Sequence, residues 1–228
     1  AAGGRVSARH ILVATGGHPV RPAIPGAELG LVSDDIFRLE ALPDSILIVG
    51  GGYIAAEFAC ILHGLGVKVT QYYRGAQILR GFDDEARGHV AEIMRASGID
   101  LRVGTDVTGL ERDPSGGVRA HGTLGDSEVF GAVLFATGRR PNTAGLGLDA
   151  IGLEPGRRGE IVVDAYSQTA VPSVYAIGDI TGRVPLTPVA IREGMAFVET
   201  VFRANPAAVD HDLIPAAVFT RPELGAIG

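Results

Sequence analysis

The stretch ILIVGGGYIAAEFACILHGLGVKVTQYYRGAQILRGFD, residues 46–83, contains a short apolar run, a glycine cluster, a helix-like segment and a second apolar run. This pattern predicts a buried strand at 46–50, a helix at 53–65 and a second strand at 67–73. A strand, a helix and a strand in this order form a βαβ unit of about 30 residues with parallel strands. The sequence therefore predicts an α/β fold built on a parallel sheet.

The glycine cluster matches the pattern G-x-G-x-x-A of dinucleotide-binding turns, and it stands between the first predicted strand and the helix. Gly50 would permit the tight turn, Gly52 would let the backbone approach a pyrophosphate, and Ala55 would let the helix pack closely. The positive end of the helix would face the pyrophosphate. The alternative is a glycine-rich turn that binds nothing. The residues predicted to line a Rossmann-like dinucleotide site are Gly50, Gly51, Gly52, Tyr53, Ile54 and Ala55.

The end of the second predicted strand is aromatic and basic. In NAD-binding units an acidic residue about 20 positions after the glycines holds the ribose 2′-hydroxyl. Here Tyr72 and Tyr73 occupy that region and Arg74 follows. If residues 75–79 form a loop, Arg80 can also lie beside the 2′ position of the ribose. Because guanidinium groups bind phosphate bidentately, the two arginines predict NADPH rather than NADH. The alternative is a pair of solvated arginines on a loop.

The composition is that of an ordinary globular protein, with 46% hydrophobic residues, 20% charged residues and a formal net charge of −6. The acidic excess argues against a nucleic-acid partner, because protein surfaces that bind nucleic acids need an excess of basic residues. We find no apolar run of ~18 residues and no signal-like segment, so we expect no membrane partner and a cytoplasmic location. The single cysteine, Cys60, is interpreted as a core thiol, and no metal site is expected.

Further elements are predicted along the rest of the chain. They are a strand at 10–14, a helix at 33–43 capped by Ser33 or Asp34, a helix at 83–97 between Asp83 or Asp84 and Gly98, three or four antiparallel strands within 99–135, strands at 161–169 and 173–180, and a helix at 187–203.

One acidic residue follows a predicted strand in a distinctive setting. Asp179 comes after the apolar residues 174–177 and a glycine, and a helix begins near Thr187, where Pro188 suits the first turn. A carboxylate at a strand end that faces a helix N-terminus could contact a polyol or ribityl chain. A helix-capping aspartate is an equally good interpretation.

Four segments, GGGYIAAEFA, YRGAQILRGFD, ATGRRPNT and VDAYSQTAVPSVYAIGDITGRVPLTPVAIREG, together resemble the FAD-dependent pyridine nucleotide–disulfide oxidoreductases, most closely the glutathione reductases of bacteria and plants. The resemblance covers essentially all 228 residues. It implies a three-layer FAD/NAD(P)-binding fold with a complete NADPH domain and a partial FAD domain. The implied domains are 1–16 (end of the first FAD segment), 17–138 (NADPH binding), 139–209 (returning FAD segment) and 210–228 (start of a truncated dimer-interface domain).

The resemblance also implies roles for individual residues. Arg74 and Arg80 would bind the 2′-phosphate of NADPH. Tyr53 would cover the flavin on its nicotinamide side, and Glu57 would face the same region, although plain helix packing and a solvated charge are the alternatives. The other implied contacts to FAD or NADPH are Thr15, Gly16, Gly138, Arg139, Asp179 and Thr187.

In the family that these segments resemble, electrons pass from NADPH to FAD, then to a cysteine pair, then to a disulfide, with help from a C-terminal histidine. Cys60 is the only cysteine here, and no histidine has the matching context. We therefore expect an internal fragment of a homodimeric reductase of glutathione disulfide, inactive by itself. The alternatives are a dihydrolipoamide dehydrogenase, a mercuric reductase or a non-catalytic NADPH-binding module.

Overall fold

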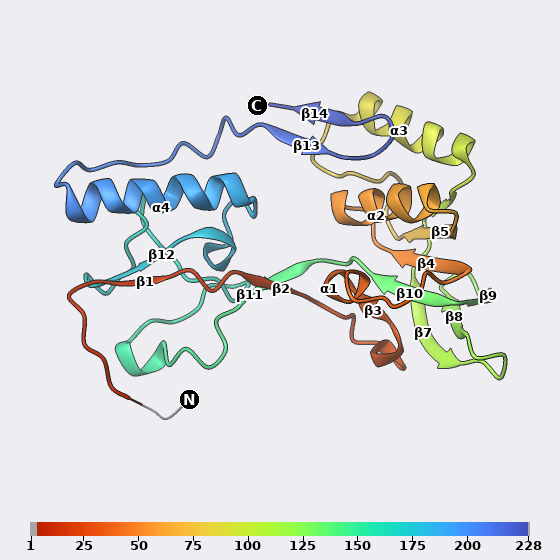
Figure 1. Cartoon of the computed structure of the whole chain (residues 1–228), viewed down its shortest axis with the longest axis horizontal. Coiled ribbons are helices and arrows are strands. Elements are labelled where there is room, and N and C mark those ends of the chain that lie inside the picture. The colour runs from red at the N-terminus through yellow and green to blue at the C-terminus, as the bar shows by residue number, and fades with distance from the viewer. Residues whose placement is uncertain (1–3, 228) are drawn as a thin grey trace. The chain divides into compact units, whose positions relative to one another are not determined.

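The computed structural model describes residues 4–227, which form two compact units (Figure 1). The first unit contains Arg139–Ile214 and the described residues up to His18. The second unit contains Pro19–Gly138 and Pro215–Ile227, and therefore includes the glycine cluster and the two predicted phosphate-binding arginines.

A five-stranded parallel sheet in the order β3-β10-β4-β5-β6 forms the centre of the second unit. Its strands are β3 (Leu31–Val32), β4 (Ser45–Val49), β5 (Lys68–Tyr73), β6 (Asp100–Val103) and β10 (Ala132–Phe135). Helix α2 (Tyr53–Gly64) connects β4 to β5, and α3 (Asp84–Ser97) connects β5 to β6. The predicted α/β fold with a parallel sheet is confirmed.

Both faces of this sheet are covered, so the second unit has three layers (Figure 1). Ile46 and Ile48 of β4 pack into a core with α2 and α3. Leu47 and Val49 point to the other face and pack against an antiparallel sheet. That sheet consists of β7 (Val107–Arg112), β8 (Val118–Gly122) and β9 (Ser127–Phe130). Alternate residues of one strand therefore supply two separate cores.

The prediction of three or four antiparallel strands within 99–135 is confirmed for three strands, but it did not include two parallel strands at the ends of this range. Only β7, β8 and β9 are antiparallel, whereas β6 and β10 join the parallel sheet. Strand β10 has the sequence AVLF, and its last three residues are buried. An apolar run of this kind is typical of a parallel strand covered on both faces.

The two predicted helix starts had different outcomes. Helix α3 begins as predicted, because the Asp83 carboxylate accepts the N–H groups of Glu85 and Ala86 at 3.0 Å. The helix predicted at 33–43 is wrong: α1 is one turn, Ser33–Ile36, and its N-cap is Val32. The carboxylate of the third residue in that turn accepts the Val32 N–H at 2.9 Å, so neither predicted residue caps the helix.

In the first unit, two short strand pairs and one long helix surround a small core. The elements are β1 (Ile11–Val13) paired with β12 (Val174–Ala176), β2 (Gly17–Pro19) paired with β11 (Arg139–Pro141), α4 (Thr187–Phe202) and the 3-10 turns η2 (Asp149–Ile151) and η3 (Gly178–Thr181). The strand predicted at 161–169 is absent, because the Asp164 carboxylate accepts the N–H groups of Tyr166 and Gln168 at 2.9 Å and folds the segment into a turn.

The remaining elements of the second unit are η1 (Ala27–Leu29) and the hairpin of β13 (Ala216–Val218) and β14 (Leu224–Ala226). Cys60 is a buried free thiol in the core beside α2, which confirms its prediction as a core residue. Within residues 4–227, no helix is long and apolar enough to cross a membrane. In the same range, no group of three or more His, Cys, Asp or Glu side chains could hold a metal ion.

Candidate functional site

The turn between β4 and α2 can only be made by glycine at its first position. Gly50 has φ of 146°, and a Cβ there would clash with the carbonyl oxygen of Ala136 and lie 3.3 Å from the Ala55 Cβ. Its N–H donates to the Tyr72 carbonyl and its carbonyl accepts from Gln71 Nε2, both at 2.9 Å. The turn is therefore held tightly against β5 and the end of β10.

At Gly52, in contrast to Gly50, there is room for a side chain. A Cβ at this position would meet nothing within 4 Å, and the residue is exposed. Gly52 is the N-cap of α2, which has no capping side chain and no acidic residue in its first turn. The first N–H groups of a helix lack intrahelical partners and attract anions. The geometry around Gly52 therefore fits a pyrophosphate.

Aromatic packing occupies the end of β5, where an NAD-binding unit would place an acid. The ring of Tyr73 lies against Gly51, so a Cβ at Gly51 would clash with it. A Cβ at Gly75 would lie 2.6 Å from the same ring. The middle glycine of the cluster is thus explained by Tyr73, a constraint that the motif alone does not contain.

Arg74 and Arg80 flank a loop that returns to the glycine turn. The N–H of Leu79 donates to the Gly51 carbonyl at 2.6 Å, and the N–H of Gly104 donates to the carbonyl of Gly75 at 3.0 Å. Both arginines are exposed. Within residues 4–227 neither guanidinium has a hydrogen bond or an ion pair, so both are available to an anion.

Tyr53 and Glu57 project from the first two turns of α2. Tyr53 is half-buried and packs against the core beside the helix. The Glu57 carboxylate accepts the N–H of Phe219, from the β13–β14 hairpin, at 2.9 Å. The neighbouring Val218 is fully buried in the same core, so the hairpin fixes this end of α2. Ile54 is also half-buried against that core.

In the first unit, the predicted flavin contacts at 15–16 are tied to Asn142. Thr15 Oγ1 donates to the Asn142 carbonyl at 3.0 Å, and Asn142 Nδ2 donates to the Thr15 carbonyl at 2.9 Å. The Asn142 N–H also donates to the Gly16 carbonyl at 2.9 Å. Sequence reasoning missed Asn142, although it lies within the quoted segment ATGRRPNT. Arg139 donates to the Gly17 carbonyl at 2.6 Å.

Asp179 lies on η3, close to the same segment. A Cβ at Gly17 would lie 3.5 Å from the Asp179 Cβ. Asp179 is half-buried, and its carboxylate has no hydrogen-bond or ion-pair partner among the described residues. Thr187 is the exposed first residue of α4, which has no capping side chain. Gly138, in the second unit, has φ of 142°, and a Cβ added there would meet nothing within 4 Å.

Sequence reasoning also missed Glu193, which lies on the buried face of α4 between Val189 and Phe197. It accepts a hydrogen bond of 2.6 Å from the Gly178 N–H, immediately before Asp179. The available signal was a carboxylate at an apolar position of an amphipathic helix, because charged groups are buried only when they are paired.

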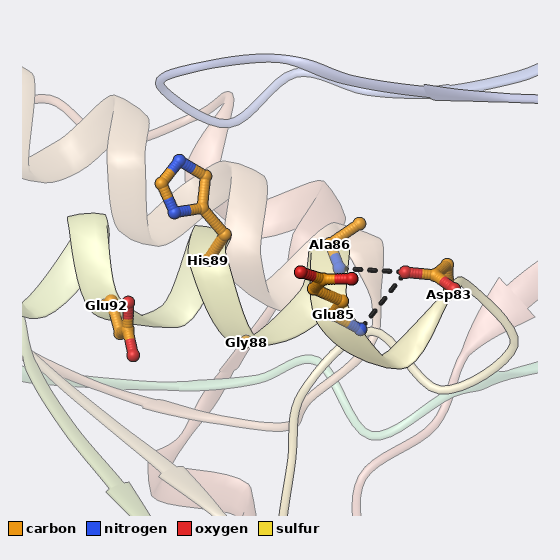
Figure 2. A pocket seen from close by; sticks show the side chains of 6 residues that line it. All are labelled: Asp83, Glu85, Ala86, Gly88, His89 and Glu92. Atoms are coloured by element: carbon orange, nitrogen blue, oxygen red, sulfur yellow. Dashed lines mark hydrogen bonds between the residues drawn. The ribbon is translucent and has the colours of Figure 1, made fainter.

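A surface hollow on α3 is a poor candidate for the nucleotide. Figure 2 shows that its lining is acidic and that Asp83 points to the N–H groups of the first helical turn. The other lining residues are Glu85, Ala86, Gly88, His89 and Glu92. Three carboxylates would repel a phosphate, so the nucleotide is expected at the glycine turn instead.

The chain is similar to curated disulfide reductases over almost its whole length. It is 50% identical to the glutathione reductase of Burkholderia cepacia, with 99% of this chain and 50% of that protein aligned. It is 46% identical to the chloroplastic/mitochondrial glutathione reductase of Pisum sativum, with 97% and 40% aligned. Trypanothione reductase of Leishmania donovani is 44% identical, with 96% and 45% aligned. The chain thus spans about half the length of the curated relatives it matches.

Among solved structures, the HOCl-induced flavoprotein disulfide reductase RclA from Escherichia coli matches with a TM-score of 0.90 and 29% identity, over 96% of this chain and 51% of that one. LpdA from Mycobacterium tuberculosis matches with a TM-score of 0.86 and 32% identity, over 96% and 48%. Glutathione reductases depend on FAD and NADPH, the two cofactors predicted from the sequence. The profile of the pyridine nucleotide-disulphide oxidoreductases matches residues 1–194, and the chain belongs to this family.

Proposed function

We propose that the protein to which this chain contributes is a glutathione-disulfide reductase that prefers NADPH to NADH. The observation that carries the proposal is that Arg74 and Arg80, at the end of β5, have no partner among residues 4–227, combined with the absence of an acid at Tyr73. Two exposed guanidinium groups beside the glycine turn favour a ligand with a phosphate in addition to its pyrophosphate. The similarity to glutathione reductases supports the choice of disulfide.

In this proposal residues 17–138, nearly all of which lie in the second unit, form the NADPH-binding domain. The N-terminus of α2 and the open surface of Gly52 hold the pyrophosphate, while Arg74 and Arg80 hold the 2′-phosphate. Ala55 lets α2 approach β4 closely enough to bring its N–H groups to the ligand. Gly138 leaves room beside the end of β10 for the nicotinamide half.

The first unit would supply part of the flavin site. FAD, when bound, supplies the redox centre between NADPH and the disulfide. Thr15 and Gly16 would line the isoalloxazine side, Asp179 would accept a hydrogen bond from a ribityl hydroxyl, and Thr187 would present the α4 N-terminus. Arg139 would hold the backbone directly after Thr15 and Gly16 through its hydrogen bond to the Gly17 carbonyl.

Tyr53 and Glu57 take supporting roles in this scheme. Tyr53 would shield the flavin on the nicotinamide side, and Glu57, whose carboxylate accepts the Phe219 N–H, would face the flavin–nicotinamide region. The redox cysteine pair is not among the 228 residues. We therefore propose that the chain alone binds NADPH without reducing glutathione disulfide, and that the whole protein acts as a homodimer.

The test of the NADPH preference is the double substitution Arg74→Met and Arg80→Met in the 228-residue chain. The control is Arg38→Met with Arg112→Met, which removes the same charge from two exposed arginines of the same unit that have no side-chain partner in the described part of the chain. We expect the dissociation constant for NADPH to rise by about 100-fold in the test variant, with NADH binding little changed. Equal losses in the two variants, or a wild-type preference for NADH, would overturn the proposal and favour the dihydrolipoamide dehydrogenase alternative.

The disulfide is tested separately with the whole protein. NADPH oxidation is followed with glutathione disulfide, trypanothione disulfide or Hg²⁺ as acceptor, and the largest kcat/KM is expected with glutathione disulfide. A larger kcat/KM with either of the others would reassign the substrate without changing the cofactor proposal. Turnover of glutathione disulfide by the 228-residue chain alone would contradict the proposed inactivity of the fragment.

A further inference from the structure

Helix α4 carries a buried carboxylate on its apolar face. The side chain of Glu193 is 2% exposed and lies one turn from Val189 and one turn from Phe197. A carboxylate in such a position is strongly disfavoured unless other groups satisfy both oxygens. The partners of Glu193 therefore indicate why the charge is placed there.

The two oxygens of Glu193 have different partners. Oε1 forms an ion pair with Arg183 Nη2 at 3.0 Å and a hydrogen bond with His211 Nε2 at 2.7 Å. Oε2 accepts from the backbone N–H of Gly178 at 2.6 Å. Burial lowers the pKa of the Arg183 guanidinium, and the Glu193 carboxylate opposes that change. One side of the carboxylate thus balances a partly buried cation, and the other side holds a turn.

That turn is η3, which carries Asp179. Gly178 has φ of 73°, and its carbonyl accepts from Thr181 Oγ1 at 2.8 Å. Arg183 Nε donates to the same Thr181 hydroxyl at 3.2 Å. Glu193 and Arg183 therefore fix the turn at both ends, while the Asp179 carboxylate itself stays without a partner among residues 4–227.

We propose that Glu193 is a positioning residue for flavin binding, which holds the Asp179 turn at a set distance from the N-terminus of α4. The proposal rests on the role of Asp179 in the proposed function. Glu193 and Thr187 lie on the same helix, so the Gly178 N–H bond couples the two expected flavin contacts, Asp179 and Thr187. A turn that is ordered before the ligand arrives does not have to be ordered on binding, which strengthens affinity.

The test compares two double variants of the whole protein that differ in whether residue 193 keeps polar atoms for the Gly178 N–H and His211. Glu193→Gln with Arg183→Met removes both charges and keeps an oxygen. Glu193→Leu with Arg183→Met removes the charges and the oxygen. Replacing a buried ion pair by apolar groups is often neutral or stabilising, so a purely structural role predicts that the Leu variant is as stable as the Gln variant and binds flavin equally well.

We expect the dissociation constant for FAD, measured by flavin fluorescence on the flavin-free protein, to be about tenfold higher in the Leu variant than in the Gln variant, with a similar or higher Tm. Equal FAD affinities in the two variants would overturn the proposal. Asp179→Ala is the reference: if it leaves FAD affinity unchanged, the proposed role of Asp179 fails and this inference fails with it. If it weakens FAD binding while the two double variants are equal, only this inference fails.

A measurement on the unsubstituted protein covers the case in which the Leu variant does not fold. Hydrogen exchange of the Gly178 amide in the flavin-free protein should be slowed at least as much as that of amides in the first turns of α4. Exchange of Gly178 at the rate of an unprotected amide would show that the turn is not held before flavin binds, and would overturn the proposal.

Discussion

The backbone N–H of Leu79 donates a hydrogen bond of 2.6 Å to the carbonyl of Gly51. This bond joins the loop between Arg74 and Arg80 to the turn at the N-terminus of α2. Leu79 is 1% exposed and has φ of 57°, a left-handed conformation that is uncommon for leucine. Its side chain is part of the core beside α2, so hydrophobic burial maintains this conformation. The proposed sites for the pyrophosphate and the 2′-phosphate are therefore connected through one buried leucine.

Leu79→Ala should weaken both the fold and the loop. Loss of a buried leucine leaves a cavity and should lower the free energy of unfolding by about 2–4 kcal/mol, measured in urea. Leu62→Ala is the matched control, because Leu62 is also 1% exposed in the same core. NADPH affinity should fall in the Leu79 variant and remain nearly unchanged in the Leu62 variant. Parallel losses of affinity would mean that Leu79 contributes only to stability.

The contact between Gly51 and Tyr73 predicts a compensating pair of substitutions. Gly51→Ala should destabilise the second unit by about 1–3 kcal/mol, because its Cβ would overlap the tyrosine ring. Adding Tyr73→Val should restore most of that loss by making room for the methyl group. The coupling is measured with a double-mutant cycle of Tm or urea midpoint. An additive result would show that the ring moves aside freely when Gly51 is substituted.

Gly50 and Gly52 should respond to alanine in opposite ways. Gly50→Ala places a Cβ against the Ala136 carbonyl at a φ of 146°, so the loss should appear in stability, by about 2 kcal/mol or more. Gly52→Ala meets no protein atom within 4 Å, so the fold should be nearly unaffected. Its methyl group would occupy the approach of the pyrophosphate, and NADPH affinity should fall by about tenfold. Intact NADPH binding by the Gly52 variant would place the pyrophosphate elsewhere.

Tyr72 should make the stability of the second unit depend on alkaline pH. The pKa of the Tyr72 hydroxyl is raised to about 12 from its ordinary 10.0, mainly by burial and also by its hydrogen bond to Asp126, while the Arg102 charge opposes the shift. Because the folded state disfavours the phenolate, this contribution to stability is complete below pH 10 and is lost as the pH rises from 10 towards 12.

The control for Tyr72 is Tyr72→Phe. The slope of unfolding free energy against pH in the alkaline range should be shallower in the Phe variant, because one titrating group has been removed. Ultraviolet absorbance should also show one tyrosine titrating late in the unsubstituted protein. Identical slopes in both proteins would mean that Tyr72 titrates in the folded state as it does in the unfolded chain.

The β4–α2–β5 unit could be predicted because its signals are local. An apolar run, a turn that needs glycine and a helix of matching length occur within 28 residues, from Ile46 to Tyr73. Helix α3 was predictable for the same reason, since Asp83 and Gly98 make the start and stop from short-range contacts. Local hydrogen bonds and backbone preferences are properties of neighbouring residues, and a sequence states them directly.

Other features depend on residues far apart in the chain. The direction of β6 and β10 depends on which strand each one pairs with, and β10 pairs with β4, more than 80 residues earlier, through Ala132 and Ile46. The alternation of apolar and polar residues along a strand does not specify which strand it pairs with. The bond from Gly178 to Glu193 was missed for the same reason: the sequence shows a charge on an apolar helix face but does not show the backbone N–H that satisfies it.

The longer segment of the second unit, Pro19–Gly138, begins and ends at neighbouring points, since the N–H of Val20 donates to the carbonyl of Gly138 at 3.1 Å. A module whose two ends meet at one point can be removed from its host, or replaced by one of different length, without stretching the flanking chain. Coenzyme preference in such a protein would then be a transplantable property. Exchange of Pro19–Gly138, together with the hairpin residues Pro215–Ile227 that share its core, for the corresponding pieces of a relative that uses the other coenzyme would test this.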